Sequence, residues 1–248
     1  MDAALYPTLH QNQERHWWYA ARRTILTAVL EELHARGLPP GTLYDLGCGV
    51  GANLPLLERF GPTVGVDMSD EAVEFCKSRG HDNVVRADLN QLEGLESGSG
   101  RVVMLADVIE HLDDETPCLR AARRLLAPGG ALLVTVPACP FLWGPSDEVA
   151  QHRRRYTEKS LRAVIEPLFD IERTTYFNTF LFGAVAAGRV LERVLSRPGY
   201  AGVSVPPEPV NGVLRSIFAA EAPLVPKVHL PIGVSLLCVA RKSQSDAM

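Results

Sequence analysis

Short runs of aliphatic and β-branched residues alternate with segments of helical periodicity through most of the chain. The apolar runs predict strands over residues 42–46, 63–67, 83–88, 101–107, 130–137, 170–177 and 233–242. Helices are predicted to begin near residues 53, 70, 113 and 157. Strands that are separated by helices indicate βαβ units and a mainly parallel sheet. The segment 132–136 lacks polar alternation, as expected of a strand that is buried on both faces.

Further helices flank this alternation. Apolar residues recur at helical spacing from about Glu14 to Ala35, which predicts one amphipathic helix that ends at the GLPPG sequence, residues 37–41. Residues 179–230 break the rhythm, with an apolar helix predicted over 180–194, a proline-rich loop over 197–209 and a second helix over 213–225. We interpret the chain as a single domain whose segments are the N-terminal helices (1–40), the core (41–178), a helical insertion (179–230) and the last strand with its tail (231–248).

Composition narrows the class of protein. The chain has 248 residues, of which 46% are hydrophobic, and a formal net charge of −4. It can bury a sizeable core, which excludes global disorder, and it lacks the basic character of a general nucleic-acid binder, so we expect no nucleic-acid partner. Five scattered cysteines without a CxxC pair argue against a disulfide framework and a structural zinc site, and they favour a cytoplasmic location. We expect neither a secretory leader nor a membrane span.

A glycine-rich sequence, DLGCGVG, occupies residues 45–51 between the first predicted strand and a helix. Glycines tolerate the positive φ of a sharp turn and let a ligand approach the backbone. The helix that follows offers unpaired N–H groups and the positive end of its dipole. The same residues satisfy the dinucleotide fingerprint G-x-G-x-x-G/A, and a tight turn without a ligand has the same pattern. The glycines alone therefore leave the ligand open.

Three carboxylates end successive predicted strands. Asp67 ends the second strand, where a carboxylate can bridge two ribose hydroxyls, and Asp88 ends the third, where it can accept from an adenine amine. Asp107 ends the fourth. Each by itself could be a solvated loop residue or a helix cap. Together they lie at the edge where open α/β sheets bind ligands, which predicts a nucleoside pocket.

These motifs, in this order, resemble those of class I S-adenosylmethionine-dependent methyltransferases, most closely the ubiquinone-type and natural-product subgroup. The resemblance covers about residues 41–177 and is carried by DLGCGVG, Asp67, RADL at 86–89, ADVIEHL at 106–112 and LLAPGGALLVTVP at 125–137. It implies a Rossmann-like α/β fold: a seven-stranded, mainly parallel sheet of order 3-2-1-4-5-7-6, with the inserted last strand antiparallel and helices on both faces. It also implies S-adenosyl-L-methionine as the cofactor and S-adenosyl-L-homocysteine as the product.

The same resemblance implies a set of cofactor contacts. Asp45 and Gly47 would hold the amino end of the methionine. Asp67 would bind the ribose, and Asp88 and Leu89 the adenine. The other cofactor contacts in this predicted set are Cys48, Gly49, Met68, Ala106 and Asp107.

The N-terminal helix carries the densest aromatic cluster of the chain, ERHWWY at residues 14–19, followed by Arg22 and Arg23. One interpretation is an amphipathic helix that packs its aromatic residues on the sheet. We favour a lid over the cofactor, similar to the N-terminal helix of related methyltransferases. In that lid, Arg22 or Arg23 would pair with the methionine carboxylate, and an aromatic face such as that of Trp18 would lie near the sulfonium.

Methyl transfer to a hydroxyl needs a base for the departing proton, and histidine has a pKa near the operating pH. His111 follows the fourth predicted strand and His152 precedes the fifth helix, so both are predicted to face the methyl group as catalytic residues. The basic loop beyond them offers Arg155 and Tyr156 to position the acceptor.

The same region also resembles a metal half-site. Asp107, Glu110 and His111, with His152 as a fourth ligand, would suit a divalent cation, and some methyltransferases use a similar E-x-x-E-H pattern with a metal. Here the first residue is an aspartate instead. We prefer the interpretation without a metal, in which the acids cap a helix and the histidine lines the pocket.

The sequence therefore predicts a methyltransferase that acts on a small apolar or amphiphilic acceptor, such as a natural product, a quinone or a lipid-like molecule, with a hydroxyl as the favoured methyl acceptor. The alternatives are an NAD-type oxidoreductase, a binding protein that has lost transfer activity, and a metal-dependent RNA 2′-O-methyltransferase. The PGG–strand element and the absence of Tyr-x-x-x-Lys count against the oxidoreductase. Residues 179–230 are expected to cap the acceptor, and any homodimer contact or peripheral membrane association is expected there.

Overall fold

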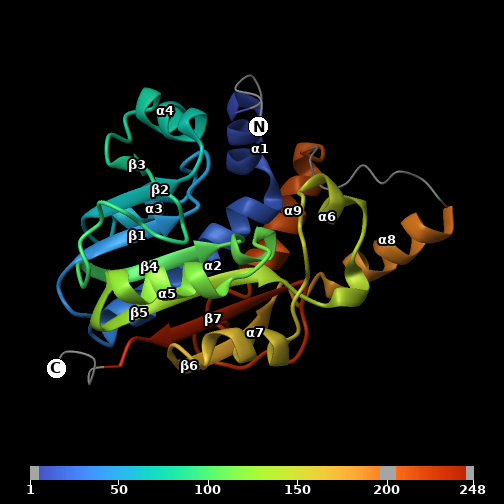
Figure 1. The fold of residues 1–248 in the computed structure, drawn as a ribbon. Helices are drawn as coiled ribbons and strands as arrows, with labels where there is room; N and C mark the ends of the chain where they lie inside the picture. Colours follow the sequence, from blue (N-terminus) through green and yellow to red (C-terminus); the bar gives the residue numbers. More distant parts are fainter. Residues whose placement is uncertain (1–5, 196–204, 244–248) are drawn as a thin grey trace.

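The computed structural model describes residues 6–195 and 205–243. A seven-stranded sheet forms its centre (Figure 1), in the order β3-β2-β1-β4-β5-β7-β6. Neighbouring strands are parallel except β7, which is antiparallel to both β5 and β6. The predicted fold class is confirmed, including the strand order. The strands are β1 (Thr42–Leu46), β2 (Thr63–Asp67), β3 (Val84–Arg86), β4 (Gly100–Ala106), β5 (Leu126–Pro137), β6 (Asp170–Phe177) and β7 (Ser235–Arg241).

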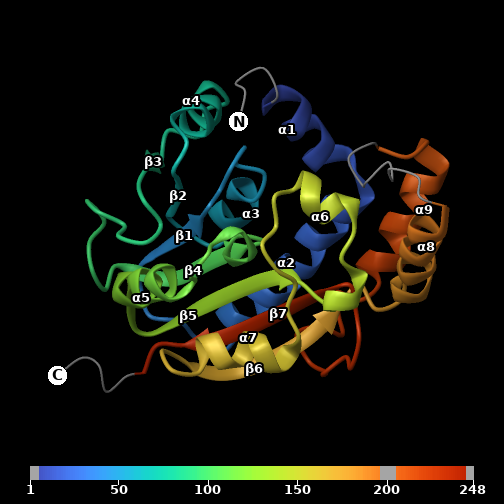
Figure 2. The same ribbon diagram turned by 45° about the vertical axis from the view of Figure 1, so that its right-hand side comes forward.

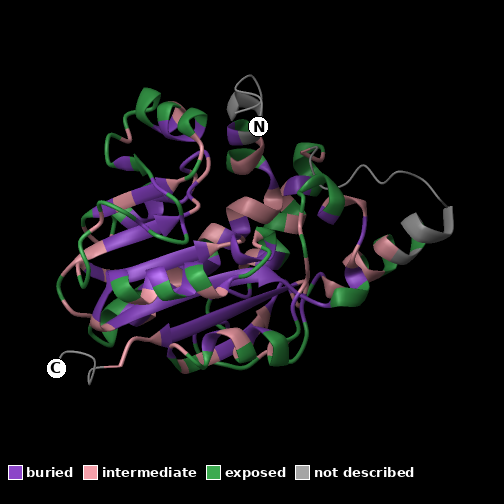
Figure 3. Cartoon of the chain, in the orientation of Figure 1, coloured by how far each residue is buried: buried purple, intermediate pink, exposed green. Residues whose placement is uncertain are grey.

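Helices cover both faces of the sheet (Figure 2). On one face lie α2 (Trp17–Ala35), α3 (Leu54–Glu58) and α9 (Glu208–Ala219), and on the other lie α5 (Thr116–Leu125) and α7 (Glu158–Ile165). Alternate residues of β4 divide between the two faces, because side chains of a strand point to opposite sides. Val102 and Met104 pack toward α2, and Val103 and Leu105 toward α5. The central strands are accordingly buried along almost their whole length (Figure 3).

The N-terminal helix predicted from about Glu14 begins at Trp17 as α2. A further helix, α1 (Tyr6–Arg15), precedes it, with a break at His16 between the two. His16 has extended backbone angles and caps α2, its Nδ1 accepting from Trp18 N at 3.2 Å. The buried side chain of Asn211, on α9, stabilises this break between the two helices. Its Oδ1 accepts from Trp17 N and its Nδ2 donates to Arg15 O, each at 2.8 Å.

Other element boundaries differ from the predictions by a few residues. The helix expected from residue 113 begins at Thr116, and β5 begins at Leu126 instead of residue 130 because Leu126 already pairs with Gly100 of β4. The second insertion helix covers Glu208–Ala219 instead of 213–225. Most of the predicted proline-rich loop lies outside the described residues. The remaining elements are α4 (Asp70–Ser78), α6 (Pro145–Val149), α8 (Phe182–Leu195) and the 3₁₀ turns η2 (Ile109–His111) and η3 (Pro140–Leu142).

The two insertion helices take different positions. Phe218 of α9 is fully buried and contacts the ring of Trp17 at 6.0 Å between ring centroids, so α9 shares the core of α2. In contrast, α8 projects from the end of the sheet beyond β6 (Figure 1). Among the described residues, no helix combines the length and apolar character needed to cross a bilayer.

Candidate functional site

A cavity of about 410 Å³ opens at the carboxyl ends of β1, β4, β5 and β6, beneath the start of α2. This is the edge of an α/β sheet at which ligands bind. Its walls come from segments that are far apart in the sequence. The lining residues are Gln13, His16, Trp17, Trp18, Tyr19, Arg22, Gly47, Cys48, Gly49, Asn53, Ala106, Asp107, Glu110, His111, Pro137, Ser146, Ala150, His152, Arg155, Asn178, Val185, Arg189, Val234 and Ser235.

The glycine turn forms the β1 end of this cavity. Gly47 has φ +76°, and a Cβ there would lie 2.7 Å from a methyl carbon of Val108, so only glycine fits without a rearrangement. Gly49 also has positive φ, but no described atom lies within 4 Å of where its Cβ would be. The turn therefore leaves open space beside its backbone, as a bound ligand requires.

Two of the predicted carboxylates lie next to the turn, and one of them, Asp67, is bonded to it. Asp67 accepts from Gly49 N at 2.8 Å through one oxygen and from Ser69 N at 3.0 Å through the other. Asp45 is buried, and burial raises its pKa to about 7. Neither residue lines the cavity, whereas Asn53, which the sequence analysis did not single out, does.

The predicted adenine contacts lie away from the cavity. Met68 is 52% exposed and Asp88 is exposed, with its carboxylate accepting from Asn90 N, whereas Leu89 is buried in the core. Of the predicted cofactor residues near β4, Ala106 and Asp107 line the cavity. The described cavity thus includes the methionine end of the predicted cofactor site and not its adenine end.

Arg22 of α2 contacts both Asp107, after β4, and the aromatic ring of Trp18. It is buried, and its guanidinium forms an ion pair with Asp107, which has a left-handed backbone conformation with φ +59°. The guanidinium also lies 4.8 Å from the centroid of the Trp18 ring. Arg23, the other arginine considered, instead donates to the backbone oxygens of Gln13 and Glu14. Between the two predicted carboxylate partners, the geometry favours Arg22.

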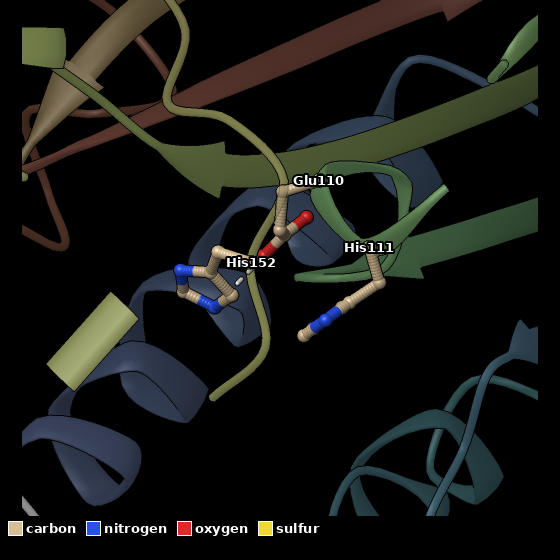
Figure 4. A group of neighbouring side chains, drawn as sticks. All are labelled: Glu110, His111 and His152. Carbon is tan, nitrogen blue, oxygen red and sulfur yellow. Dashed lines mark ion pairs between the residues drawn. The ribbon is translucent and has the colours of Figure 1, made fainter. Parts of the chain in front are cut away.

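Glu110, His111 and His152, called here the Glu–His–His cluster, converge from η2 and from the loop after α6 (Figure 4). Their nearest ligand atoms all lie within 4.8 Å of one another. The two imidazole rings meet edge to face, with centroids 4.9 Å apart. Burial and the neighbouring His152 lower the pKa of His111, so its ring is neutral at pH 7.

Glu110 is fully buried, and neither of its carboxylate oxygens has a hydrogen-bond partner in the described part of the chain. Burial raises its pKa to about 8, which keeps the group protonated at neutral pH. Its Oε1 lies 4.0 Å from His152 Nε2, too far for a hydrogen bond. The cluster offers three ligands of the kinds that bind divalent cations, but Asp107 is not among them because it pairs with Arg22.

The comparisons with known proteins agree with this geometry. Residues 44–134 match the family described as "Methyltransferase domain". The fold is similar to that of a SAM-dependent methyltransferase from Archaeoglobus fulgidus, with a TM-score of 0.56 and 19% identity over 89% of this chain and 94% of that one. Residues 44–134 thus match a methyltransferase domain, in a chain whose fold is similar to that of a SAM-dependent methyltransferase.

Two curated relatives match parts of the chain. An uncharacterized 37.1 kDa protein of a Streptomyces fradiae transposon is 30% identical over 212 residues, which cover 81% of this chain and 54% of the relative. A ubiquinone biosynthesis O-methyltransferase of Xanthomonas oryzae pv. oryzae is 32% identical over 99 residues, 38% of this chain and 41% of the relative. The aligned part thus spans about half the length of these relatives or less.

Asp147 orients His152. Its fully buried carboxylate accepts from His152 Nδ1 at 2.9 Å, from Arg155 Nε at 2.8 Å and from Gly144 N at 2.9 Å. Burial raises the pKa of Asp147, but the bonds from His152 and Arg155 outweigh it and hold the pKa below its usual value. An ionised carboxylate only accepts, so His152 Nδ1 carries a proton and Nε2 is left as the free acceptor.

Of the two residues predicted to bind the acceptor, Arg155 and Tyr156, only Arg155 lines the cavity. Arg155 lines the cavity, although its guanidinium is bound to Asp147 and to Ala138 O. Tyr156 does not line it: the side chain is buried in the core, with its hydroxyl directed to Ile109 O at 3.4 Å. Asp147 and Asn178 were not predicted from the sequence. Asp147 carried a weak signal, an acidic residue just before the basic loop, and Asn178 carried none beyond its position after a strand.

Proposed function

We propose that the protein transfers the methyl group of S-adenosylmethionine to a hydroxyl of a small-molecule acceptor. One observation supports this most strongly: a single cavity joins the open backbone of the glycine turn to both His111 and His152. The partial match to a ubiquinone biosynthesis O-methyltransferase favours oxygen as the acceptor atom. The protein is expected to work in the cytoplasm.

The residues at the β1 end fit this cofactor. A ligand that contacts the turn would occupy the open space beside Gly49. The buried guanidinium of Arg22, which also lines the cavity, would bind the carboxylate of the methionine. On binding, that carboxylate would share Arg22 with Asp107 or replace it. The bound cofactor supplies a methyl carbon on a positively charged sulfur, which leaves as a neutral thioether when the acceptor oxygen takes the methyl group.

His152 is the base in this proposal. His152 lines the cavity, and its Nε2 would take the proton that the hydroxyl loses as the new oxygen–carbon bond forms. Asp147 keeps the ring in the required tautomer and stabilises the imidazolium that results. His111, whose ring is neutral and lies against that of His152, orients the acceptor oxygen. The aromatic side chains of α2 cover this region and exclude water.

The experiment is methyl transfer from methyl-labelled S-adenosylmethionine to a panel of phenols, catechols and hydroxylated lipids. The wild type should label at least one hydroxyl compound. His152→Gln, which retains a polar side chain of similar length, should reduce kcat by about 10²-fold or more while the affinity for S-adenosylhomocysteine changes less than twofold. Equal turnover by the two proteins would contradict the role of His152, and binding of the cofactor without any turnover would indicate a binding protein.

Partners other than the methyl acceptor are proposed to bind at the helical insertion, residues 179–230. Exposed apolar side chains of the insertion include Phe180, Leu191 and Val213. They suit contact with an apolar acceptor, with a second copy of the chain or with a membrane surface. Light scattering and vesicle sedimentation would distinguish self-association from membrane binding.

A further inference from the structure

The end of the cavity that follows β6 holds a buried amide with no hydrogen-bond partner among the described residues. Asn178 lines the cavity and is 0% exposed, yet neither its Oδ1 nor its Nδ2 has a hydrogen-bond partner in the described ranges. Most buried polar side-chain atoms have such a partner, because losing water without replacement is unfavourable. The amide thus has both an NH₂ donor group and a carbonyl acceptor whose hydrogen bonds no described residue satisfies.

The position of Asn178 belongs to the acceptor end. It follows β6 at one edge of the sheet, whereas the glycine turn follows β1 and His111 follows β4. In the strand order, β5 and β7 lie between β4 and β6. A molecule that presents a hydroxyl to the two histidines from the side opposite the cofactor therefore extends toward Asn178.

The backbone around Asn178 is fixed. Its φ is +56°, a conformation that asparagine tolerates better than most residues. Asn178 O accepts from Val234 N at 3.4 Å, and the buried Glu221 accepts from Phe180 N at 2.8 Å. Register places Ser235 opposite both Phe177 and Pro137, so the amide lies in a compact wall with Pro137, Val234 and Ser235. Such a wall positions the amide for recognition before a ligand arrives.

We propose that Asn178 is a specificity-determining residue, which binds a neutral group that presents a hydrogen-bond donor and an acceptor side by side on the methyl acceptor, as a carboxamide does. This inference rests on the proposed function and names the chemistry at the far end of its acceptor. Recognition by paired hydrogen bonds discriminates strongly, since an analogue that lacks one partner leaves a buried group unpaired.

The test compares 4-hydroxybenzamide with 4-hydroxyacetophenone, which has a methyl group in place of the amide nitrogen. Binding of each to protein saturated with S-adenosylhomocysteine is measured by ligand-observed NMR. The wild type should bind the benzamide about tenfold more tightly. Asn178→Gly keeps the positive φ and removes the amide, so it should bind the two compounds equally, with unchanged affinity for S-adenosylhomocysteine.

A second variant changes the preference instead of removing it. Asn178→Asp replaces the donor with an acceptor, so it should prefer 4-hydroxybenzamidine, which only donates, over the benzamide. No preference in the wild type, or the same preference in Asn178→Gly, would overturn the inference about Asn178. A wild type that does not bind S-adenosylhomocysteine would overturn the proposed function instead, and titrations without it would still decide the role of the amide.

Discussion

Replacing Glu110 with glutamine measures how the buried carboxyl group beside the two histidines changes the free energy of unfolding with pH. The side chain is fully buried without a hydrogen-bond partner among the described residues, and burial raises its pKa from 4.5 to about 8. The folded state therefore retains a proton that the unfolded state releases from about pH 4.5 upward. Because the folded pKa is the higher one, this group favours folding below pH 4.5, and the contribution is lost as pH rises toward 8.

The size of this effect follows from the pKa change. A rise from 4.5 to about 8 corresponds to a loss of at most about 5 kcal/mol of unfolding free energy over that pH range. Glutamine has nearly the same shape and stays neutral, so Glu110→Gln should match the wild type at pH 5 and be more stable by a few kcal/mol at pH 8.

Urea unfolding at pH 5, 6, 7 and 8, with EDTA present, measures the difference between the two proteins at each pH. Glu148→Gln is the matched control, since it makes the same substitution at an exposed residue on the nearby α6. A constant difference between Glu110→Gln and the wild type across this range would refute the view that the fold holds Glu110 protonated.

Three further predictions address the cofactor end and the Glu–His–His cluster. Gly47→Ala should lower the free energy of unfolding by about 1–3 kcal/mol more than Gly80→Ala does. Both positions have positive φ, but only the Cβ at position 47 would meet a neighbour, Val108. Equal losses for the two variants in urea unfolding would contradict this. Arg22→Met should weaken the binding of S-adenosylhomocysteine at least tenfold in a calorimetric titration, while Arg23→Met should change it less than twofold; similar losses in both would show that Arg22 is not the carboxylate partner. Dialysis against EDTA should leave methyl transfer unchanged within about twofold, whereas a loss that a divalent cation restores would replace the histidine base by a metal at this cluster.

The sheet and its turn could be predicted because they depend on local patterns. Aliphatic runs, the glycines of residues 45–51 and the PGG segment mark the strand ends, and strand topology then follows the family resemblance. The break at His16 could not be predicted in the same way. The predicted apolar stripe begins only at Trp17, and the residue that stabilises the break, Asn211, lies 194 positions beyond Trp17 in the sequence.

The candidate site shows the same division between local and distant determinants. His111 and His152 were predicted from their positions after a strand and before a helix, and the structure places them side by side. Their partners required the fold: Asp147 was not recognisable as the residue that orients His152. Likewise, the pairing of Arg22 with Asp107 joins residues that are 85 positions apart, and no local pattern indicates it.

The most direct test is a calorimetric titration of the purified protein with S-adenosylhomocysteine and, separately, with NAD⁺. If the carboxyl edge of the sheet holds an adenosyl thioether, one molecule of S-adenosylhomocysteine should bind per chain, and NAD⁺ should produce no heat of binding. Saturation by NAD⁺ with no response to S-adenosylhomocysteine would contradict the account.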